Sequence, residues 1–207
     1  MVAIPQHGDP TIEAMKRKME KVPRDKRTYL GASAIGNPCA RQIWYDYNGF
    51  YKEPYDADTL MNFEDGHRTE DLTAERLRLV DGITLITHGE DGNQLGFTDL
   101  DGKFKGHYDG IITGLYQAPK TPHIWECKAC AEKKFRELEL CIEKHGEKNA
   151  LEKWNENYFA QHQLYMHYEG ITRGYMTVAR AGGRGYITVR TDYQMSVALK
   201  YIERARK

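Results

Sequence analysis

Residues 106–128 constrain the fold most, because charged side chains interrupt two runs that otherwise have the composition of buried β-strands. The apolar members of these runs are β-branched or aromatic: Tyr108, Ile111, Ile112, Ile124 and Trp125. Gly114, Pro119 and Pro122 lie between the runs, and such residues are poorly tolerated inside a helix or a strand. The stretch therefore predicts two strands joined by a turn-rich connection.

In the second run the charged side chains fall on one face. Because side chains alternate across a strand, Glu126 and Lys128 should share a face with Ile124. Trp125 and Cys127 should occupy the opposite face. Burying a carboxylate is costly unless it is paired or bound to a cation. The alternative is that Glu126 and Lys128 face solvent at a sheet edge, where such pairs contribute little.

The first run adds a second carboxylate. We expect Asp109 to share a strand face with His107 and Ile111. Carboxylate oxygens are hard ligands that suit Mg²⁺ or Mn²⁺, and such an ion polarises a phosphodiester and lowers the pKa of a bound water. A neighbouring lysine can orient that water or stabilise charge on phosphate oxygens. Asp109, Glu126 and Lys128 therefore predict metal-assisted hydrolysis.

These residues resemble the catalytic signature of the PD-(D/E)XK nuclease superfamily. The match consists of Asp109 followed by Glu126-Cys127-Lys128, with Tyr108 where the superfamily label has proline. The resemblance implies an α/β fold with a restriction-endonuclease-like core, in which a central mixed β-sheet is flanked by helices. It also implies that the active site lies on one face of that sheet.

A segment before the strands resembles the one that opens RecB-like and lambda-exonuclease-like nucleases. Residues 29–47 contain a Gly-Ala-Ser triplet ending at Ser33 and a Cys-x-Arg triplet ending at Arg41. In those relatives the segment lies beside the DNA, which implies phosphate contacts for Ser33 and Arg41, and also for Arg27. A hydroxyl, a guanidinium fork and loop amides suit a phosphate. The structural alternative is that Ser33 caps a turn and Arg41 pairs with an acid such as Asp46.

Residues 57–80 predict one long helix, interrupted or started near Gly66. Helical spacing places five residues on one face: Phe63, His67, Glu70, Ala74 and Leu77. Gly66 and Glu70 match the G-x-x-x-E pattern that relatives carry on this helix, which implies that Glu70 is a third acid of the metal site. His67 is the alternative ligand, and a satisfied polar group in the core is the structural alternative.

Residues 149–168 predict a helix after the charged strand. Five residues recur at spacings of 3, 4, 3 and 4: Leu151, Trp154, Tyr158, Gln161 and Tyr165. Gln161 and Tyr165 resemble the Q-x-x-x-Y motif of the RecB-like branch, which implies that they steady Lys128 or the DNA. The alternative is an aromatic core stripe that carries one buried amide.

The remaining pattern completes an α/β domain. Helices are predicted over residues 11–22 and 131–145, and strands over 83–88, 93–97, 174–181 and 185–190. A last helix should begin at Asp192 and turn Met195, Leu199 and Ile202 inward. We interpret residues 1–28 as a basic N-terminal arm, with either a solvated helix or a phosphate-contacting role, and residues 29–207 as the nuclease domain.

Composition excludes several classes of protein. The 207 residues carry 30 basic and 30 acidic side chains, so any nucleic-acid surface must be local. Four cysteines are too few for a disulfide scaffold and fit a reducing compartment. No apolar run approaches the length of a membrane span, and residues 1–10 lack an apolar targeting core. We expect a cytoplasmic protein without a membrane partner.

The cysteines raise the question of a cluster. Cys127 and Cys130 form a C-x-x-C motif, but Cys127 should point to the face opposite Glu126. Some relatives bind an iron–sulfur cluster through one early cysteine, which Cys39 matches, and three near the C-terminus. Since no cysteine follows Cys141, we expect no iron–sulfur cluster and a free buried thiol at Cys127.

The order of these motifs implies a Mg²⁺- or Mn²⁺-dependent DNA exonuclease of the RecB-like and lambda-exonuclease-like branch, serving DNA recombination or repair or phage DNA metabolism. Glu70, Asp109 and Glu126 would hold the metal, the backbone carbonyl of Cys127 would be an additional ligand, and Lys128 would position the water. The implied partners are DNA and a single-strand annealing or recombination protein. The alternatives are a nuclease-fold module that binds without cutting, a structure-specific endonuclease, and an unrelated α/β protein.

Overall fold

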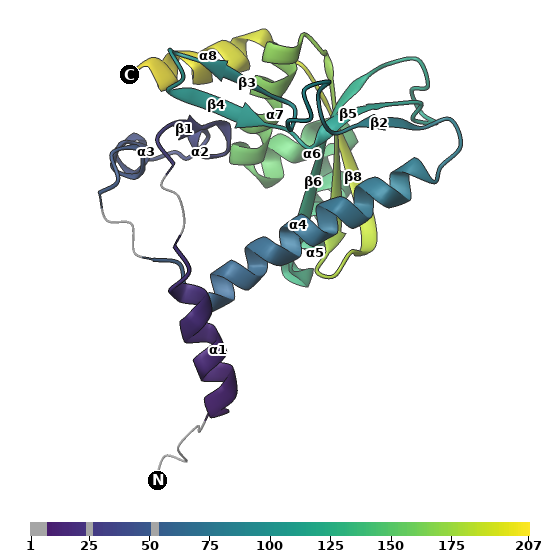
Figure 1. Cartoon of the computed structure of the whole chain (residues 1–207). Coiled ribbons are helices and arrows are strands. Elements are labelled where there is room, and N and C mark those ends of the chain that lie inside the picture. The colour runs from purple at the N-terminus through teal and green to yellow at the C-terminus, as the bar shows by residue number, and fades with distance from the viewer. Residues whose placement is uncertain (1–7, 24–26, 51–53) are drawn as a thin grey trace.

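The computed structural model describes residues 8–23, 27–50 and 54–207. It is a mixed α/β fold built on two β-sheets, with helices packed on both sides of the larger one (Figure 1). The predicted fold class, a mixed sheet flanked by helices, is confirmed. Within the described residues, no helix combines the length and the apolar character that a bilayer crossing requires.

The larger sheet has the strand order β2-β5-β6-β7-β8. Its strands are β2 (Thr84–Ile86), β5 (Gly110–Thr113), β6 (His123–Cys130), β7 (Arg173–Arg180) and β8 (Arg184–Asp192). β6 and β7 are parallel, and the other neighbours are antiparallel. β6 therefore lies in the middle of the sheet and is paired on both edges, so the charged residues on it do not belong to an edge strand.

The smaller sheet has the order β1-β4-β3, with β1 (Leu30–Gly31), β4 (Phe104–His107) and β3 (Gly96–Asp99). Only Tyr108 and Asp109 separate β4 from β5, so the chain passes from one sheet to the other at these residues. Both are buried, and the period-2 alternation stops there. Asp109 therefore lies in a bend and not within a strand, although Asp109 and His107, which were expected to share a face, line one cleft.

Helices cover both faces of the larger sheet. They are α1 (Pro10–Glu20), α2 (Ala32–Ile35), α3 (Ala40–Tyr47), α4 (Ala57–Arg78), α5 (Glu132–His145), α6 (Glu147–Trp154), α7 (Glu156–Glu169) and α8 (Met195–Arg206). On one face Trp125 and Cys127 of β6 pack with Ala74 of α4. On the other face Met176 of β7 packs with Leu151 of α6. β6 is thus buried from both sides.

α4 is a single helix of 22 residues that runs through Gly66 without interruption. It begins after Asp56, whose side chain accepts a hydrogen bond from the amide of Thr59 at 2.7 Å. Only the second half of the predicted inward face is inside, since Ala74 is buried and Phe63 is exposed. The first half extends past the larger sheet toward α1 (Figure 1), where Ala57 and Leu60 are buried and Phe63 is not.

The helix predicted over residues 149–168 is two helices. α6 ends at Trp154, and Asn155 begins α7 by accepting a hydrogen bond from the amide of Tyr158 at 3.0 Å. The prediction missed this break because the apolar spacing continues across it. α7 is buried nearly all round between Phe159 and Met166, so it is a core helix.

The two ends of the chain also depart from the predicted pattern. Asp192 belongs to β8 and pairs with Lys148 at 2.8 Å, so it does not cap the last helix. α8 starts at Met195, which is exposed together with Leu199. Of the three residues predicted to face inward only Ile202 is buried, beside Ala198 and Tyr201. At the other end α1 forms as expected but buries none of its own described residues. Residues 1–7 and 24–26 of the predicted arm lie outside the described residues.

Two glycines give a matched test of this packing. A Cβ at Gly106 would lie 2.5 Å from the ring of Phe97 and 2.6 Å from that of Tyr165, whereas one at Gly66 meets nothing within 4 Å. We expect Gly106→Ala to lower the free energy of unfolding by about 1–3 kcal/mol through overpacking. Gly66→Ala should raise it by about 0.5–1 kcal/mol, because alanine is the better helix former. Urea unfolding measures both, and a neutral Gly106→Ala would contradict the packing around β4.

Candidate active site

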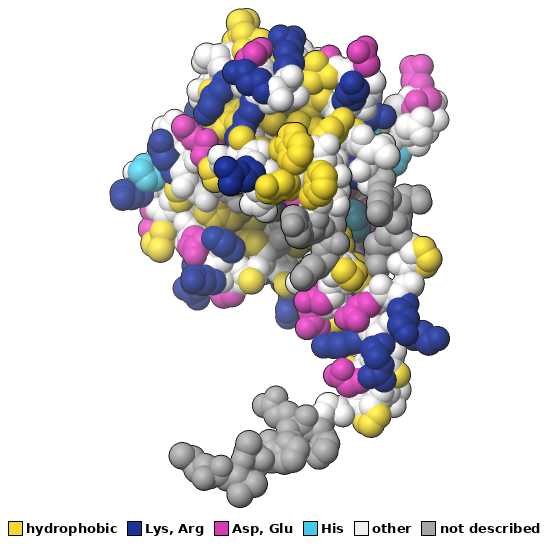
Figure 2. All heavy atoms as spheres, turned by 90° about the vertical axis from the view of Figure 1, so that its left-hand side faces the viewer, with side chains coloured by type: hydrophobic (Ala, Val, Ile, Leu, Met, Phe, Trp, Pro, Cys, Tyr) yellow, Lys and Arg dark blue, Asp and Glu magenta, His cyan; other side chains and the backbone are white. Residues whose placement is uncertain are grey.

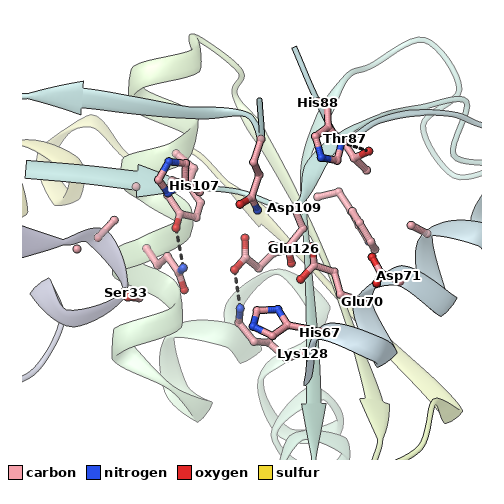
Figure 3. Close-up of a pocket in the computed structure, with 18 of the residues that line it drawn as sticks. Ser33, His67, Glu70, Asp71, Thr87, His88, His107, Asp109, Glu126 and Lys128 are labelled. Atoms are coloured by element: carbon pink, nitrogen blue, oxygen red, sulfur yellow. Dashed lines mark hydrogen bonds and ion pairs between the residues drawn. The ribbon is translucent and has the colours of Figure 1, made fainter. Parts of the chain in front are cut away.

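A cleft of about 660 Å³ opens between α4, the ends of β4 and β5, β6 and α7 (Figure 3). It is lined by most of the sequence-predicted site residues: Arg27, Ser33, His67, Glu70, Asp109, Glu126, Lys128, Gln161 and Tyr165. These residues are separated by up to 138 positions in the chain, from Arg27 to Tyr165 (165 − 27 = 138), so the fold assembles them.

Two predicted residues are placed elsewhere. Arg41 lies on the exposed surface of α3 and is not among the described residues that line the cleft. The side chain of Cys127 is buried on the α4 side of the sheet, as the strand alternation predicts, with its Sγ 4.0 Å from the carbonyl oxygen of Thr69. The metal-binding role of the Cys127 carbonyl and the DNA-binding role of Arg41 stay predictions.

Glu126 and Lys128 form the centre of the site. Their side chains share one face of β6, and Lys128 Nζ lies 2.5 Å from Glu126 Oε1. Glu126 is only 1% exposed. Its second oxygen, Oε2, is buried without a hydrogen-bond partner among the described residues. The predicted alternative of a solvated surface pair is therefore wrong.

Asp109 is held against the same strand by its backbone. Its Oδ2 accepts a hydrogen bond from the amide of Cys127 at 2.7 Å. Asp109 lies in the bend between β4 and β5, directly before Gly110, which pairs in register with Trp125 of β6. Figure 3 shows Asp109, Glu126 and Glu70 converging from the bend, from β6 and from α4. These three carboxylates thus lie close enough to Lys128 for its charge to act on each of them.

Burial and mutual repulsion raise the pKa of each acid. Burial, then the neighbouring Asp109, raises the pKa of Glu126 to about 8 and that of Glu70 to about 7. Burial also raises the pKa of Asp109. Burial opposes the charge on Lys128, but Glu126 and Asp109 outweigh it and raise the pKa of the ammonium group. Lys128 alone therefore does not compensate the three acids, and Glu70 and Glu126 titrate near neutral pH.

This donor set fits a divalent cation. A buried carboxylate oxygen without a partner is costly, and hard oxygen ligands suit Mg²⁺ or Mn²⁺. In the described part of the chain, no group of three His, Cys, Asp or Glu side chains is already assembled to hold a metal ion. The reason is that Glu126 is turned to Lys128 and Asp109 to the Cys127 amide. Metal binding would therefore compete with the Glu126–Lys128 ion pair.

Of the two candidate ligands on α4, the structure favours Glu70. Glu70 is half-buried and feels the charge of Asp109 directly. His67 is exposed one turn earlier, at the rim of the cleft. The three-residue spacing places both on one side of the helix, and the charge of His67 also acts on Asp109, where it lowers the pKa.

Gln161 and Tyr165 close the cleft from α7. Both are buried, and Gln161 Nε2 donates a hydrogen bond to the Tyr165 hydroxyl at 2.7 Å, as their i, i+4 spacing allows. Burial, then the charge of Glu126, raises the pKa of Tyr165 well above its ordinary value. Tyr165 therefore keeps its proton and can donate it toward the acids. Lys128 also lies over the ring of Tyr158 of α7, with its Nζ 5.4 Å from the ring centroid.

One end of the cleft is basic and contains residues that the sequence analysis missed. The Arg27 guanidinium carbon lies 5.0 Å from the ring centroid of Tyr29, and Lys105 Nζ lies 5.3 Å from it. Lys105 arrives there because it pairs in register with Gly31 in the parallel β1–β4 ladder. A Cβ at Gly31 would lie 2.4 Å from Arg27 Nη1, so the glycine makes room for the guanidinium. The sequence analysis had named Arg27 but not Lys105, because no local pattern reveals the pairing of Lys105 with Gly31.

Comparison with known proteins gives structural relatives only. No protein-family model and no curated protein matches the sequence. The fold is similar to the crystal structure of an alkaline exonuclease (LHK-Exo) from Laribacter hongkongensis, with a TM-score of 0.57 and 13% identity over 87% of this chain and 86% of that one. Its complex with dAMP gives a TM-score of 0.55 and 12% identity over 86% and 84%.

A phage related exonuclease from Haemophilus somnus 129PT is similar to the same degree. Its TM-score is 0.54 and its identity 12%, over 91% of this chain and 93% of that one. These likenesses extend over nearly the whole of each chain, but at 12–13% identity they show the fold alone. The fold is consistent with the nuclease superfamily that the motifs resemble.

The raised pKa values of the acids predict that the stability of the metal-free protein falls as the pH rises. Because Glu126 and Glu70 hold protons more tightly in the folded chain, the stability this gives is full below the unfolded value of about 4.5 and is lost as pH rises toward 8. In EDTA we expect the free energy of unfolding to fall by a few kcal/mol from pH 5 to 9, since one pKa unit is worth about 1.36 kcal/mol. Glu126→Gln should flatten this slope, and Glu90→Gln, an exposed control, should not. If the slope were unchanged in Glu126→Gln, the pKa of Glu126 would not be raised in the folded chain.

Proposed function

We propose that the protein is a Mg²⁺- or Mn²⁺-dependent deoxyribonuclease that hydrolyses phosphodiester bonds from DNA ends. The observation that carries the proposal is the buried Glu126, ion-paired with Lys128 and left with an unpartnered oxygen beside Asp109 and Glu70. A fold that only needed a core would place apolar residues at such a position. The similarity to structures of an alkaline exonuclease and a phage related exonuclease supports the same assignment.

Each residue has a role that its surroundings support. A cation held by Glu70, Asp109 and Glu126 would polarise the phosphodiester and lower the pKa of an attacking water. Lys128 stays protonated beside the acids, so it acts as a donor that orients the water or stabilises charge on phosphate oxygens. Gln161 fixes the Tyr165 hydroxyl at the same wall. The acids, not Lys128, are the groups able to accept a proton near neutral pH.

The basic end of the cleft supports action from a DNA end. Arg27, Lys105 and Ser33 line the same cleft as the acids. A guanidinium, an ammonium and a hydroxyl together suit a terminal phosphate, which distinguishes an end from the interior of a strand. The complex of the structural relative with dAMP, a deoxynucleoside monophosphate, supports such a ligand. A single-strand annealing or recombination protein as partner belongs to this proposal and is argued only from the resemblance.

The first test is the metal requirement. Linear DNA labelled at either end should be degraded with Mg²⁺ or Mn²⁺, and not with EDTA or Ca²⁺, because Ca²⁺ takes more ligands in looser geometry. Asp109→Ala should abolish degradation while leaving metal-free stability unchanged or higher, since it relieves repulsion among the acids.

Asp71→Ala is the matched control, because Asp71 lines the same cleft from the exposed side of α4. It should keep most of the activity. Circular DNA separates the endonuclease alternative, since an end-dependent enzyme leaves it intact. Full activity in EDTA would rule out the metal mechanism, and DNA binding without degradation under any metal would favour the binding-module alternative.

The second test asks which arginine reads the end. Arg27 lines the cleft and Arg41 does not, although both flank the Ser33 segment. We expect Arg27→Ala to slow degradation of phosphorylated ends roughly tenfold or more, which corresponds to the loss of a charge-assisted hydrogen bond, and to affect hydroxyl ends little. Single-turnover rates on the two kinds of end measure this.

Arg41→Ala serves as the comparison. It should not slow degradation of phosphorylated ends more than that of hydroxyl ends. If Arg41→Ala alone lost the preference for phosphate, the sequence-based assignment of Ser33 and Arg41 would hold and the geometric one would fail. If Arg27→Ala were equally slow on both ends, Arg27 would be a general backbone contact.

A further inference from the structure

A second groove lies on the other side of β1 from the cleft. Tyr29 and Gly31 line the cleft, whereas Leu30 between them lines the groove, because successive residues of an extended segment face opposite ways. The groove has a volume of about 740 Å³. Its walls are α3, the turn between β3 and β4, and the end of α8, which lie together in Figure 1.

The α3 wall presents aromatic rings to solvent. Trp44 is 53% exposed and Phe50 is 50% exposed, and Tyr47 beside them is also exposed. The rings of Trp44 and Phe50 are stacked, with centroids 5.6 Å apart and planes 9° from parallel. α3 itself buries only Ile43. Figure 2 shows hydrophobic side chains gathered on this side of the molecule, with Lys and Arg beside them. Such an exposed apolar group marks a binding surface.

The opposite walls are basic. The charged residues that line the groove are four cations, Lys103, Arg204, Arg206 and Lys207, and one acid, Asp101. The chain as a whole is neutral, so this excess is a local arrangement. Arg204 is fixed in place because it donates to the carbonyl oxygens of Ile35 at 3.1 Å and Pro38 at 3.2 Å. That contact ties the end of α8 to the segment before α3 and holds the two walls together.

We propose that this groove binds a single strand of nucleic acid, with unpaired bases stacked on Trp44 and Tyr47 and phosphates facing Lys103 and Arg206. Exposed aromatic rings beside cations suit single strands, because an unpaired base offers a face that a duplex keeps stacked inside. The net positive lining favours a polyanion over an apolar protein surface. The groove is a binding site separate from the proposed catalytic cleft, and it does not require the cleft to be active.

The test is binding of a labelled oligothymidylate of fifteen or so nucleotides, measured by anisotropy in EDTA so that no cleavage occurs. We expect salt-dependent binding, weakened about tenfold by Trp44→Ala and by Tyr47→Ala, which corresponds to the loss of one stacked base. Arg206→Ala should reduce the salt slope. Tyr116→Ala, which removes a 75%-exposed aromatic ring outside the groove, is the control and should bind as the wild type.

Trp44 also provides a spectroscopic readout. Stacking of a base should quench its emission, whereas Trp125 is fully buried and should not respond. We expect Trp44→Phe to lose the quenching and yet bind within about threefold of the wild type, because phenylalanine still stacks. Quenching that persists in Trp44→Phe, or wild-type affinity in Trp44→Ala, would overturn the proposal.

The outcomes separate this proposal from the nuclease assignment. Oligothymidylate binding that depends on Trp44, in a protein that degrades no DNA, would support the groove and contradict the nuclease. Degradation of duplex ends without Trp44-dependent binding would do the reverse. If Trp44→Ala changed the oligomeric state by light scattering and left DNA affinity intact, the surface would be a contact between copies of the chain and the proposal would be overturned.

Discussion

The buried contact between Glu126 and Lys128 is the constraint on which the rest of the structure depends. It lies on the central strand β6, paired on both edges and covered by helices on both faces. Burying this contact beside two further carboxylates costs free energy, and Lys128 offsets only part of it. The bend that carries Asp109 toward β6 and the buried wall of α7 both serve the same cleft. Buried acids with strongly raised pKa values are typical of functional sites, where they are kept despite their cost in stability.

The sequence predicted what strict local geometry determines. The alternation along β6 placed Glu126 and Lys128 together because that strand is regular over its whole length. Gln161 and Tyr165 meet because they are one turn apart on α7. Asp109 was predicted from its place in the preceding run and from the superfamily motif, although it lies in a bend between two sheets and not within a strand. The motif carried information about long-range geometry that periodicity does not contain.

The remainder depends on tertiary packing that short-range patterns do not reveal. Arg27 and Arg41 flank the same motif, and only the fold decides that α3 turns the second away from the cleft. Lys105 enters the site through its register with Gly31 across a parallel ladder, which no local pattern encodes. The break at Asn155 escaped because a capping side chain interrupted an apolar stripe that otherwise continues. The sequence also did not predict the groove beside α3, because its lining residues come from separate elements that only the fold brings together.

The central claim is that the three acids of the cleft hold a divalent cation in place of protons. Calorimetric titration with Mn²⁺ at pH 7, repeated in buffers of different ionisation enthalpy, tests it most directly. Since the pKa values of Glu70 and Glu126 are about 7 and 8, the account predicts that Mn²⁺ binding releases protons, and that Glu126→Ala loses both the binding and the release. Absence of Mn²⁺ binding to the wild type, or equal affinity in Glu126→Ala, would contradict it.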